Sequence, residues 1–326
     1  MTEERCASNM NPLRMNNTES KVACVIVTYF PDYAFINKVL LSIKDQVDEV
    51  IIINNSNHFL FDIGTIFTED IYLIELGDNY GIAYAHNVGL IKAKSLGYKF
   101  ALLLDQDSLP SPMFVKELMK AFDINTPDSE NIVASGPSYV DIRNNTLIQH
   151  SSVGKFNNNF LYVNFLISSG LLISIDKIYK IGGMDSSYFI DLVDYEWCYR
   201  AALNGYKLIG SNSARMEHNI GKRLIIIDKI FNITYHDPLR NYYLTRNTIS
   251  LLKKYKFILN YNSIIFHLIT IIKIILKAPL IYFLIDKDFN RFKFIYIGLI
   301  HGFNNISGKL DFKSFSCIKI KKTELE

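Results

Sequence analysis

Short apolar runs alternate with helical patterns through the first third of the chain. Residues 22–29 form such a run, rich in β-branched side chains, which Pro31 and Asp32 end. Residues 34–46 follow with apolar positions three and four apart, which predicts a helix. The same criteria predict further strands at residues 50–53, 71–75 and 100–104 and a further helix at residues 81–95. Alternation of this kind is typical of a parallel, doubly wound sheet.

The middle of the chain is less regular and carries a cluster of carboxylates. Residues 165–174 predict an apolar strand, and residues 188–203 predict a strand end that continues into a helix. Asp191, Asp194 and Glu196 lie within six residues there, beside Trp197. Carboxylates also favour a solvated helix start, through the helix dipole. The aromatic and apolar neighbours, however, would desolvate a carboxylate and raise its pKa toward that of a useful general base.

The last third of the chain is apolar and basic. Residues 258–285 are very apolar but include Lys273 and Lys277, one turn apart on one helical face, and residues 289–300 repeat this mixture. A spanning helix needs about 20 apolar residues with few charges, so the pattern favours a helix lying in the membrane interface. The alternative is a helical hairpin packed on the domain. No nucleic-acid motif is present, so nucleic acid is not an expected partner.

Composition and charge separate an acidic body from this basic tail. Hydrophobic residues make up 49% of the 326 residues and charged residues 21%, which excludes a disordered or low-complexity chain. Residues 1–221 contain 17 Lys and Arg against 25 Asp and Glu, whereas residues 222–326 contain 18 against 7. The net charge of +3 therefore divides into −8 and +11. A basic, apolar tail indicates contact with an anionic surface such as membrane lipid.

The N-terminus and the cysteines indicate an intracellular setting. Residues 1–20 are polar and lack an apolar run, so we expect a flexible leader and not a signal peptide. The four cysteines include no CxxC pair, which supports neither a disulfide framework nor a cysteine zinc site. A reducing cytoplasm is the simplest compartment.

Polar side chains follow the predicted strands where a ligand of a parallel sheet would lie. Thr28, Asn54 and Asn55 come after the first two strands, and Asp105 and Asp107 after the strand at residues 100–104. Each cluster alone is also what a turn requires. Two carboxylates around one residue at the end of an apolar strand, however, suit a divalent cation that carries phosphates.

Seven segments occur in an order that carries a resemblance. They are VACVIVTYFPD at 22–32, EVIIINNSN at 49–57, DNYGIAYAHNVGL at 78–90, LLLDQDSLP at 102–110, SSGLLIS at 168–174, YFIDLVDYEWCYRAALNGY at 188–206 and RNYYLTRN at 240–247. Together they resemble the inverting glycosyltransferases of family two, in particular the bacterial rhamnosyltransferase group, over about residues 21–310. The DQD and FIDxVDxEWCxRA segments together are specific, whereas either aspartate pair alone is weak. The resemblance implies an α/β fold of the GT-A type, Rossmann-like, with a mostly parallel sheet and flanking helices, followed by a C-terminal amphipathic helical region.

The resemblance also implies how a nucleotide-sugar donor is bound. The residues implied for the base pocket are Thr28, Asn54 and Asn55, and those implied to close over the ribose and phosphates are Asn79, Gly81 and Asn87. Asp105 would contact the ribose or diphosphate, and Asp107 would ligate Mg²⁺ or Mn²⁺. This chain departs from the family at Asn54, where an Asp is usual, which alters a contact to the pyrimidine ring.

Further site residues follow from the second half of the resemblance. Asp194 matches the catalytic aspartate that takes the proton of the acceptor hydroxyl, and Asp191 and Glu196 would support it or position the acceptor. His218 matches a histidine that completes the metal shell in related enzymes, although a lone histidine is more often structural. Arg240, Arg246 and Asn247 are candidates to clamp the diphosphate, since guanidinium groups suit phosphate. They would alternatively bind lipid headgroups or the carboxyl ends of helices.

These observations predict a metal-dependent enzyme at the inner membrane. It would transfer L-rhamnose from dTDP-L-rhamnose to a polyprenyl-diphosphate-linked oligosaccharide, for O-antigen, capsule or another surface polysaccharide. Alternatives are a transferase of another sugar from a UDP donor, such as galactofuranose, glucose or an aminosugar, a nucleotidyltransferase, and a catalytically silent assembly subunit. We expect a leader at residues 1–20, a GT-A domain at 21–250 and a membrane-associating helical region at 251–326, peripheral on the cytoplasmic face.

Overall fold

A computed structural model gives the fold of the chain. The structure describes residues 21–58, 71–123, 129–141, 146–148, 150, 152–218, 222–226, 231–235, 237–257, 259 and 261–311. The leader predicted at residues 1–20 lies outside the described residues.

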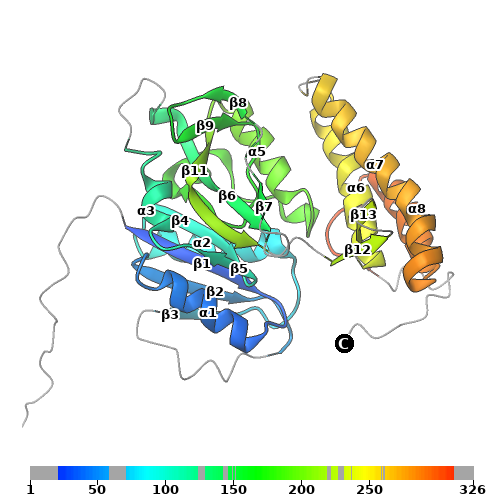
Figure 1. The fold of residues 1–326 in the computed structure, drawn as a ribbon, viewed down its shortest axis with the longest axis horizontal. Helices are drawn as coiled ribbons and strands as arrows, with labels where there is room; N and C mark the ends of the chain where they lie inside the picture. Colours follow the sequence, from blue (N-terminus) through cyan, green and yellow to red (C-terminus); the bar gives the residue numbers. More distant parts are fainter. Residues whose placement is uncertain are drawn as a thin grey trace, which may run out of the picture.

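The first half of the central sheet is parallel, as the alternating pattern predicted (Figure 1). Its elements are β1 (Val22–Thr28), α1 (Tyr33–Ile43), β2 (Glu49–Asn54), β3 (Ile71–Glu75), α2 (Ile82–Ser95) and β4 (Phe100–Asp105). The strands lie in the order β3-β2-β1-β4, and each pairs in parallel with its neighbour. Their carboxyl ends therefore meet at one edge of the sheet, and the polar residues of the predicted site lie there.

The second half of the sheet is mixed. It contains β5 (Ser108–Pro110), α3 (Phe114–Met119), a 3₁₀ helix at Ser129–Asn131, β6 (Ile132–Asp141), β7 (Thr146–Ile148), β8 (Ser152–Lys155), β9 (Phe160–Val163), β10 (Leu171–Ser174), α4 (Ile175–Ile181), the 3₁₀ helix η3 (Ser186–Tyr188), α5 (Val193–Leu203) and β11 (Lys207–His218). The sheet continues from β4 in the order β10-β6-β11-β9-β8, with β5 against β11 and β7 against β6. Of these pairs, β6 with β11 is parallel and the others are antiparallel.

Two segments differ from the sequence-based expectation. The strand predicted at residues 165–174 is only Leu171–Ser174, because Gly170 has a φ of +80° and the Leu171 N–H donates to the Ser168 carbonyl over 3.1 Å, which makes a turn. The strand end predicted at the start of residues 188–203 is instead the end of η3 followed by a tight turn. Both differences lie where the chain passes the carboxyl edge of the sheet.

The sheet has a hydrophobic core on each face. In β1, Val25 and Val27 belong to the core under α2, while Cys24 and Ile26 belong to the core under α1. Successive residues of a strand point to opposite faces, so a strand covered on both sides must be apolar throughout. All seven residues of β1 are buried, which explains why its sequence is a continuous apolar run.

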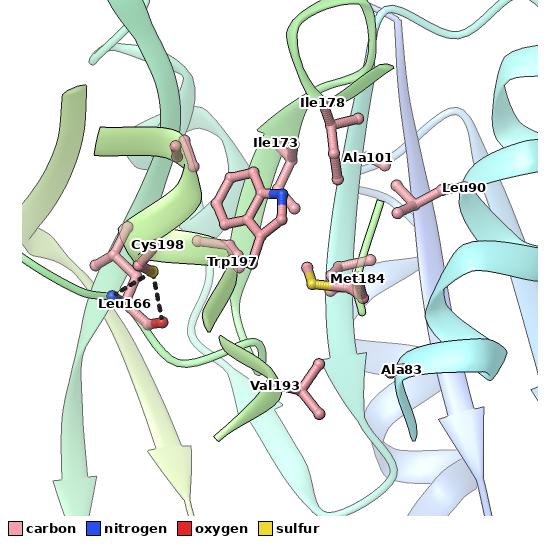
Figure 2. Packing of buried hydrophobic residues seen from close by; sticks show 14 of the residues in the cluster. Ala83, Leu90, Ala101, Leu166, Ile173, Ile178, Met184, Val193, Trp197 and Cys198 are labelled. Carbon is pink, nitrogen blue, oxygen red and sulfur yellow. Dashed lines mark hydrogen bonds between the residues drawn. The ribbon is translucent and has the colours of Figure 1, made fainter. Parts of the chain in front are cut away.

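The helix α5 is fixed in the core through Trp197, which is fully buried (Figure 2). Its indole lies among Met184, Val193 and Ile173, and its Nε1 donates to the Gly182 carbonyl over 3.3 Å. The backbone N–H of Leu166 donates to the sulfur of Cys198, the next residue, over 3.4 Å. The packing of its hydrophobic side chains therefore fixes the position of the segment that carries Asp194, the predicted base.

The C-terminal part is helical, beyond a small hairpin of β12 (Lys222–Ile226) and β13 (Phe231–Tyr235). It consists of α6 (Pro238–Tyr255), α7 (Tyr261–Ile281), a π-helical turn at Tyr282–Asp286 and α8 (Asn290–Phe303). Gly298 and Gly302 of α8 lie so close to α6 that a Cβ at either position would meet α6 atoms at 2.8 Å. The domain boundary predicted between residues 250 and 251 falls inside α6, so the helical part begins at Pro238.

Close packing of α2 on β1 generates a stability prediction. A Cβ added at Gly89 would overlap with Cγ1 of Val25. Gly89→Ala should therefore destabilise the fold by about 1–3 kcal/mol through overpacking, although alanine is favoured in a helix by about 1 kcal/mol. Urea unfolding measures this. In a Val25→Ala background the same change should cost much less, and equal costs in the two backgrounds would contradict the packing explanation.

Candidate active site

The ends of β1 and β4 are joined by the side chain of Gln106. Its Oε1 accepts from the Tyr29 N–H over 2.7 Å and its Nε2 donates to the Tyr29 carbonyl over 3.1 Å. Thr28 is buried, and its carbonyl accepts from the Asn55 N–H over 2.8 Å. This edge is therefore a fixed backbone surface before any ligand is present.

Asn55 organises the loop that leads into α2. Its Nδ2 donates to Oδ1 of Asn79 over 3.2 Å, and its Oδ1 accepts from the Tyr80 N–H over 2.8 Å. Asn79 in turn accepts from the Gly81 N–H over 3.0 Å. Gly81 has a φ of +88°, and a Cβ there would lie 2.5 Å from the Phe189 carbonyl oxygen, so only glycine fits. Of the residues predicted to close over the donor, Asn79 and Gly81 thus belong to one connected loop at the start of a helix.

Asn54 is engaged within the protein. It is buried, and its Nδ2 donates to Oε2 of Glu75 and to the His58 carbonyl, each over 2.5 Å. An aspartate at this position would place a second carboxylate against Glu75. The departure from the family residue therefore has a local physical reason, the carboxylate at the end of β3.

Asp105 and Asp107 lie at the end of β4, with Ser169 beside them. The Asp105 N–H donates to Oγ of Ser169 over 3.2 Å, and the hydroxyls of Ser169 and Ser108 are 2.6 Å apart. Burial, and then the charge of Asp107, raise the pKa of Asp105 to about 7, while Arg240 lowers it. A bound cation would stabilise the ionised forms of two such adjacent carboxylates.

The carboxylates fit Mg²⁺ or Mn²⁺ by their chemistry. Hard cations prefer oxygen ligands, and Mg²⁺ is commonly held by one or two carboxylates together with phosphate oxygens of the substrate. Within the described part of the chain, no group of three or more His, Cys, Asp or Glu side chains is arranged to hold a metal ion. Asp105 and Asp107 would therefore need the donor's own phosphates to complete a coordination shell.

Asp194 lies at the N-terminus of α5, in a partly buried position. Burial raises its pKa to about 6, against hydrogen bonds from backbone amides, including those of Tyr195 and Ser168, that lower it. The Tyr195 N–H lies 3.0 Å from Oδ1 of Asp194. A carboxylate with this pKa is ionised at neutral pH and is still basic enough to accept a proton.

Asp191 and Arg240 form an ion pair beside Asp194. The Arg240 Nη2 and Nε lie 2.8 Å and 3.0 Å from Oδ1 of Asp191. The charge of Asp191, followed by smaller effects of Asp105 and Asp194, raises the pKa of Arg240. The charge of one guanidinium therefore interacts with carboxylates from both halves of the fold. Nearly half of the Arg240 side chain remains exposed to solvent.

Tyr139 of β6 lies near Asp194 and Asp105, and no pattern in its own segment predicts this. Its hydroxyl donates to the Ser169 carbonyl over 3.2 Å. Burial first, and then the charges of Asp194 and Asp105, raise its pKa well above the usual value. Ser169 lies in the segment SSGLLIS, which belonged to the resemblance, but its bonds to Asp105 and Ser108 needed the fold to be seen.

Glu196 points away from this cluster. It is fully buried, and its carboxylate accepts from Arg200, Lys254 and the Tyr255 hydroxyl at 2.7–3.0 Å. These contacts join α5 to α6. Of the predicted catalytic carboxylates, the structure brings Asp191 and Asp194 together and gives Glu196 a supporting position behind them.

Two residues predicted at the donor have other partners. Arg246 is 1% exposed, and its guanidinium donates to the carbonyls of Ser187 and Tyr188 at the end of η3, among others. Asn87 exchanges two hydrogen bonds with the backbone of Met184, at 2.7 and 2.8 Å. Neither side chain can bind a ligand without breaking these hydrogen bonds. We therefore assign both side chains a structural role. For Arg246, the alternative of binding a helix carboxyl end is the one observed.

His218 is placed by its backbone. It ends β11 and pairs with Ser108, the residue after Asp107. Its side chain lies outside the described part of the structure, so its role as a metal ligand stays a prediction.

Comparison with known sequences identifies the family. The glycosyl transferase family 2 profile matches residues 24–175. The dTDP-rhamnosyl transferase RfbF of Shigella flexneri is 32% identical over 263 residues, which cover 77% of this chain and 86% of RfbF. The chain therefore belongs to glycosyl transferase family 2.

Comparison with solved structures concerns the fold. The crystal structure of GalNAc-T7 with UDP, GalNAc and Mn²⁺ matches 74% of this chain with a TM-score of 0.56 and 12% identity, and the chain spans 51% of GalNAc-T7. S. aureus TarS 1–349 matches 86% of this chain and 80% of its own with a TM-score of 0.54 and 14% identity. These similarities confirm the predicted GT-A fold. Fold, family and site together define a glycosyltransferase.

The raised pKa of Asp194 generates a prediction for pH. Transfer should rise with pH through a midpoint near 6, since the carboxylate accepts a proton only when ionised. Because the folded pKa exceeds the ordinary value, ionisation of Asp194 should cost stability as pH rises from about 4 to about 6 and remain costly above that. Asp194→Asn should lower kcat roughly 10²–10⁴-fold while raising the melting temperature at pH 7. A variant that keeps its activity, or melts lower than wild type at pH 7, would contradict the assignment.

Proposed function

We propose that this glycosyltransferase transfers L-rhamnose from dTDP-L-rhamnose to a hydroxyl of a polyprenyl-diphosphate-linked oligosaccharide. The observation that carries the proposal is the convergence of Asp105, Asp194 and the Asp191–Arg240 pair at the carboxyl edge of the sheet. The sugar is supported by the 32% identity to a dTDP-rhamnosyl transferase.

One displacement accounts for the chemistry. The acceptor oxygen attacks the anomeric carbon as Asp194 takes the hydroxyl proton, and the bond from that carbon to the diphosphate oxygen breaks with inversion. The nucleoside diphosphate leaves with the electron pair of that bond. Arg240, held by Asp191, would stabilise the growing negative charge. No covalent intermediate on the protein is needed.

The donor would lie along the edge formed by β1, β2 and β4. The backbone near Thr28 and Asn55 and the loop of Asn79 and Gly81 would bind the nucleoside and its phosphates. Asp107, with Asp105 beside it, would hold Mg²⁺ or Mn²⁺. A bound cation there supplies charge neutralisation for the leaving diphosphate.

A donor panel tests this proposal. Purified protein is offered dTDP-L-rhamnose and a series of UDP-sugars with Mg²⁺, Mn²⁺ or EDTA, and with lipid-linked acceptor extract. We expect transfer from dTDP-L-rhamnose, loss of transfer in EDTA, and loss in Asp107→Asn. Asp176→Asn, at an exposed position on α4, is the matched control and should behave as wild type.

The outcomes of the panel separate the alternatives. Preference for a UDP-sugar would refute the rhamnose donor and leave the displacement intact. Full activity in EDTA would remove the cation from the proposal. If no donor is consumed by the wild type with acceptor present, a catalytically silent assembly subunit becomes the better interpretation.

The C-terminal helices support the membrane part of the proposal. Tyr261–Asp286 is one helical run of hydropathy 2.2, long and apolar enough to cross a membrane, and only 11% of its most apolar window is buried. Two of its buried side chains, Ile274 and Ala278, pack against residues of α6 and α8. The exposed apolar side chains of α7 are Phe266, Leu268, Ile269, Ile272, Ile275, Leu276 and Leu280.

This arrangement favours a helix that lies on the membrane. A stripe of α7 is already packed on the protein, so the helix presents its other face outward as one side of a three-helix unit. Lys273 and Lys277 on the same helix suit anionic headgroups. The enzyme would then be peripheral on the cytoplasmic face of the inner membrane, where a polyprenyl-linked acceptor is reached.

Vesicle binding tests this surface. Leu276 is 63% exposed on α7, and Leu276→Asp should weaken binding to anionic phospholipid vesicles roughly tenfold or more, as expected for a leucine withheld from lipid. Leu203→Asp, at an exposed leucine of α5, is the control and should bind like wild type. Flotation with vesicles gives the bound fraction. Equal loss in both variants, or wild-type protein that resists extraction by alkaline carbonate, would contradict a peripheral helix.

A further inference from the structure

The turn between η3 and α5 is strained at several residues in a row. Phe189, Asp191 and Leu192 have φ values of 62°, 65° and 60° although none is glycine. At Phe189, with ψ of −67°, the Ile190 N–H donates back to the Tyr188 carbonyl over 2.7 Å. This is a γ-turn of the rare form with positive φ. Such strain persists only where the surroundings hold it, and it concentrates at functional sites.

The turn lies between the two halves of the site. On one side, the Phe189 carbonyl accepts from the Ile82 N–H over 2.8 Å at the start of α2 and packs against Gly81. On the other side, the turn carries Asp191 and leads directly into Asp194. Its conformation therefore sets the position of the catalytic aspartates relative to the loop expected to bind the donor.

Two neighbouring residues of α6, Arg246 and Asn247, donate hydrogen bonds to the backbone carbonyls of the turn. Nδ2 of Asn247 lies 2.9, 2.8 and 2.8 Å from the carbonyl oxygens of Tyr188, Ile190 and Asp191. Arg246 donates to the Tyr188 carbonyl as well, over 2.9 Å. Both side chains of this pair are 1% exposed. The side-chain amide of Asn247 and the guanidinium of Arg246 therefore provide the donors for the inward-facing carbonyls of the strained turn.

The orientation of that amide is fixed by Arg246. Nε of Arg246 donates to Oδ1 of Asn247 over 2.8 Å. A guanidinium has no acceptor, so it must face the amide oxygen, and the amide NH₂ group must then face the carbonyls. Asparagine supplies this acceptor and donor pair, whereas aspartate would offer only oxygens.

We propose that Asn247, oriented by Arg246, is a positioning residue that holds the 188–192 turn and so aims Asp191 and Asp194 at the donor. The inference rests on the proposed function for the role of the two aspartates. It assigns the C-terminal helix α6 a second part in catalysis, through Asn247, that involves no contact between Asn247 and the substrate. A residue that only stabilises helix packing would affect unfolding and leave the rate of each folded molecule unchanged.

Asn247→Asp tests the clamp, because it keeps the size of the side chain and its contact with Arg246 but turns an acceptor toward the carbonyls. We expect kcat to fall roughly 10²-fold, the size of effect that a small misplacement of a reacting group produces, with a much smaller change in the donor KM. Hydrogen exchange at the Ile82 and Ile190 amides should accelerate, because both donate to carbonyls of the turn. Thr248→Val, the next buried position of α6, is the control, since within the described residues the Thr248 hydroxyl donates inside the helix to the Leu244 carbonyl.

A second variant covers the case in which Asn247→Asp does not fold. Arg246→Lys keeps the charge and removes the Nε contact that orients the amide, and it should show the same split between kcat and KM in milder form. If wild type transfers sugar and both folded variants do so at its kcat, the clamp is refuted while the proposed function stands. If wild type transfers no sugar, the proposed function fails, and unchanged exchange at Ile82 and Ile190 would refute the clamp independently.

Discussion

The site depends on keeping carboxylates out of water and close to one another. Asp105 and Asp194 come from opposite halves of the fold, and burial raises the pKa of each. Ionised groups in such a place need compensation, which here comes from backbone amides, from Arg240 and, in the proposed mechanism, from a cation. The rigid sheet edge and the packed core around Trp197 hold these groups where compensation is possible.

The C-terminal helices are part of this arrangement and are not only an appendage. Arg240 pairs with Asp191, Lys254 and Tyr255 meet Glu196, and Asn247 meets the 188–192 turn. All of these α6 residues contact the segment around α5. The same helix packs against α8 and against α7, whose exposed apolar face is proposed to meet the membrane. The helix α6 therefore contacts both the segment that carries the catalytic aspartates and the helix proposed to lie on the membrane.

The roles of particular residues followed from the sequence to different degrees. Asp105, Asp107 and Asp194 were identifiable because they stand at fixed places, the end of a strand and the start of a helix, within segments that resemble a known family. Arg246 and Asn87 looked equally suitable for a donor, but their amide and guanidinium groups satisfy backbone carbonyls and amides far away in sequence. Tyr139 gave no signal at all, since in β6 it is one more buried aromatic residue.

The sequence by itself determined the parallel half of the sheet, its two apolar faces and the polar edge, because the periods of strands and helices are local properties of the chain. The tertiary structure alone decided the turn at residues 188–192. Positive φ at Phe189, Asp191 and Leu192 is locally unfavourable, and no pattern in their own segment predicts it. It exists because Arg246 and Asn247, more than fifty residues later, supply the donors that its carbonyls require.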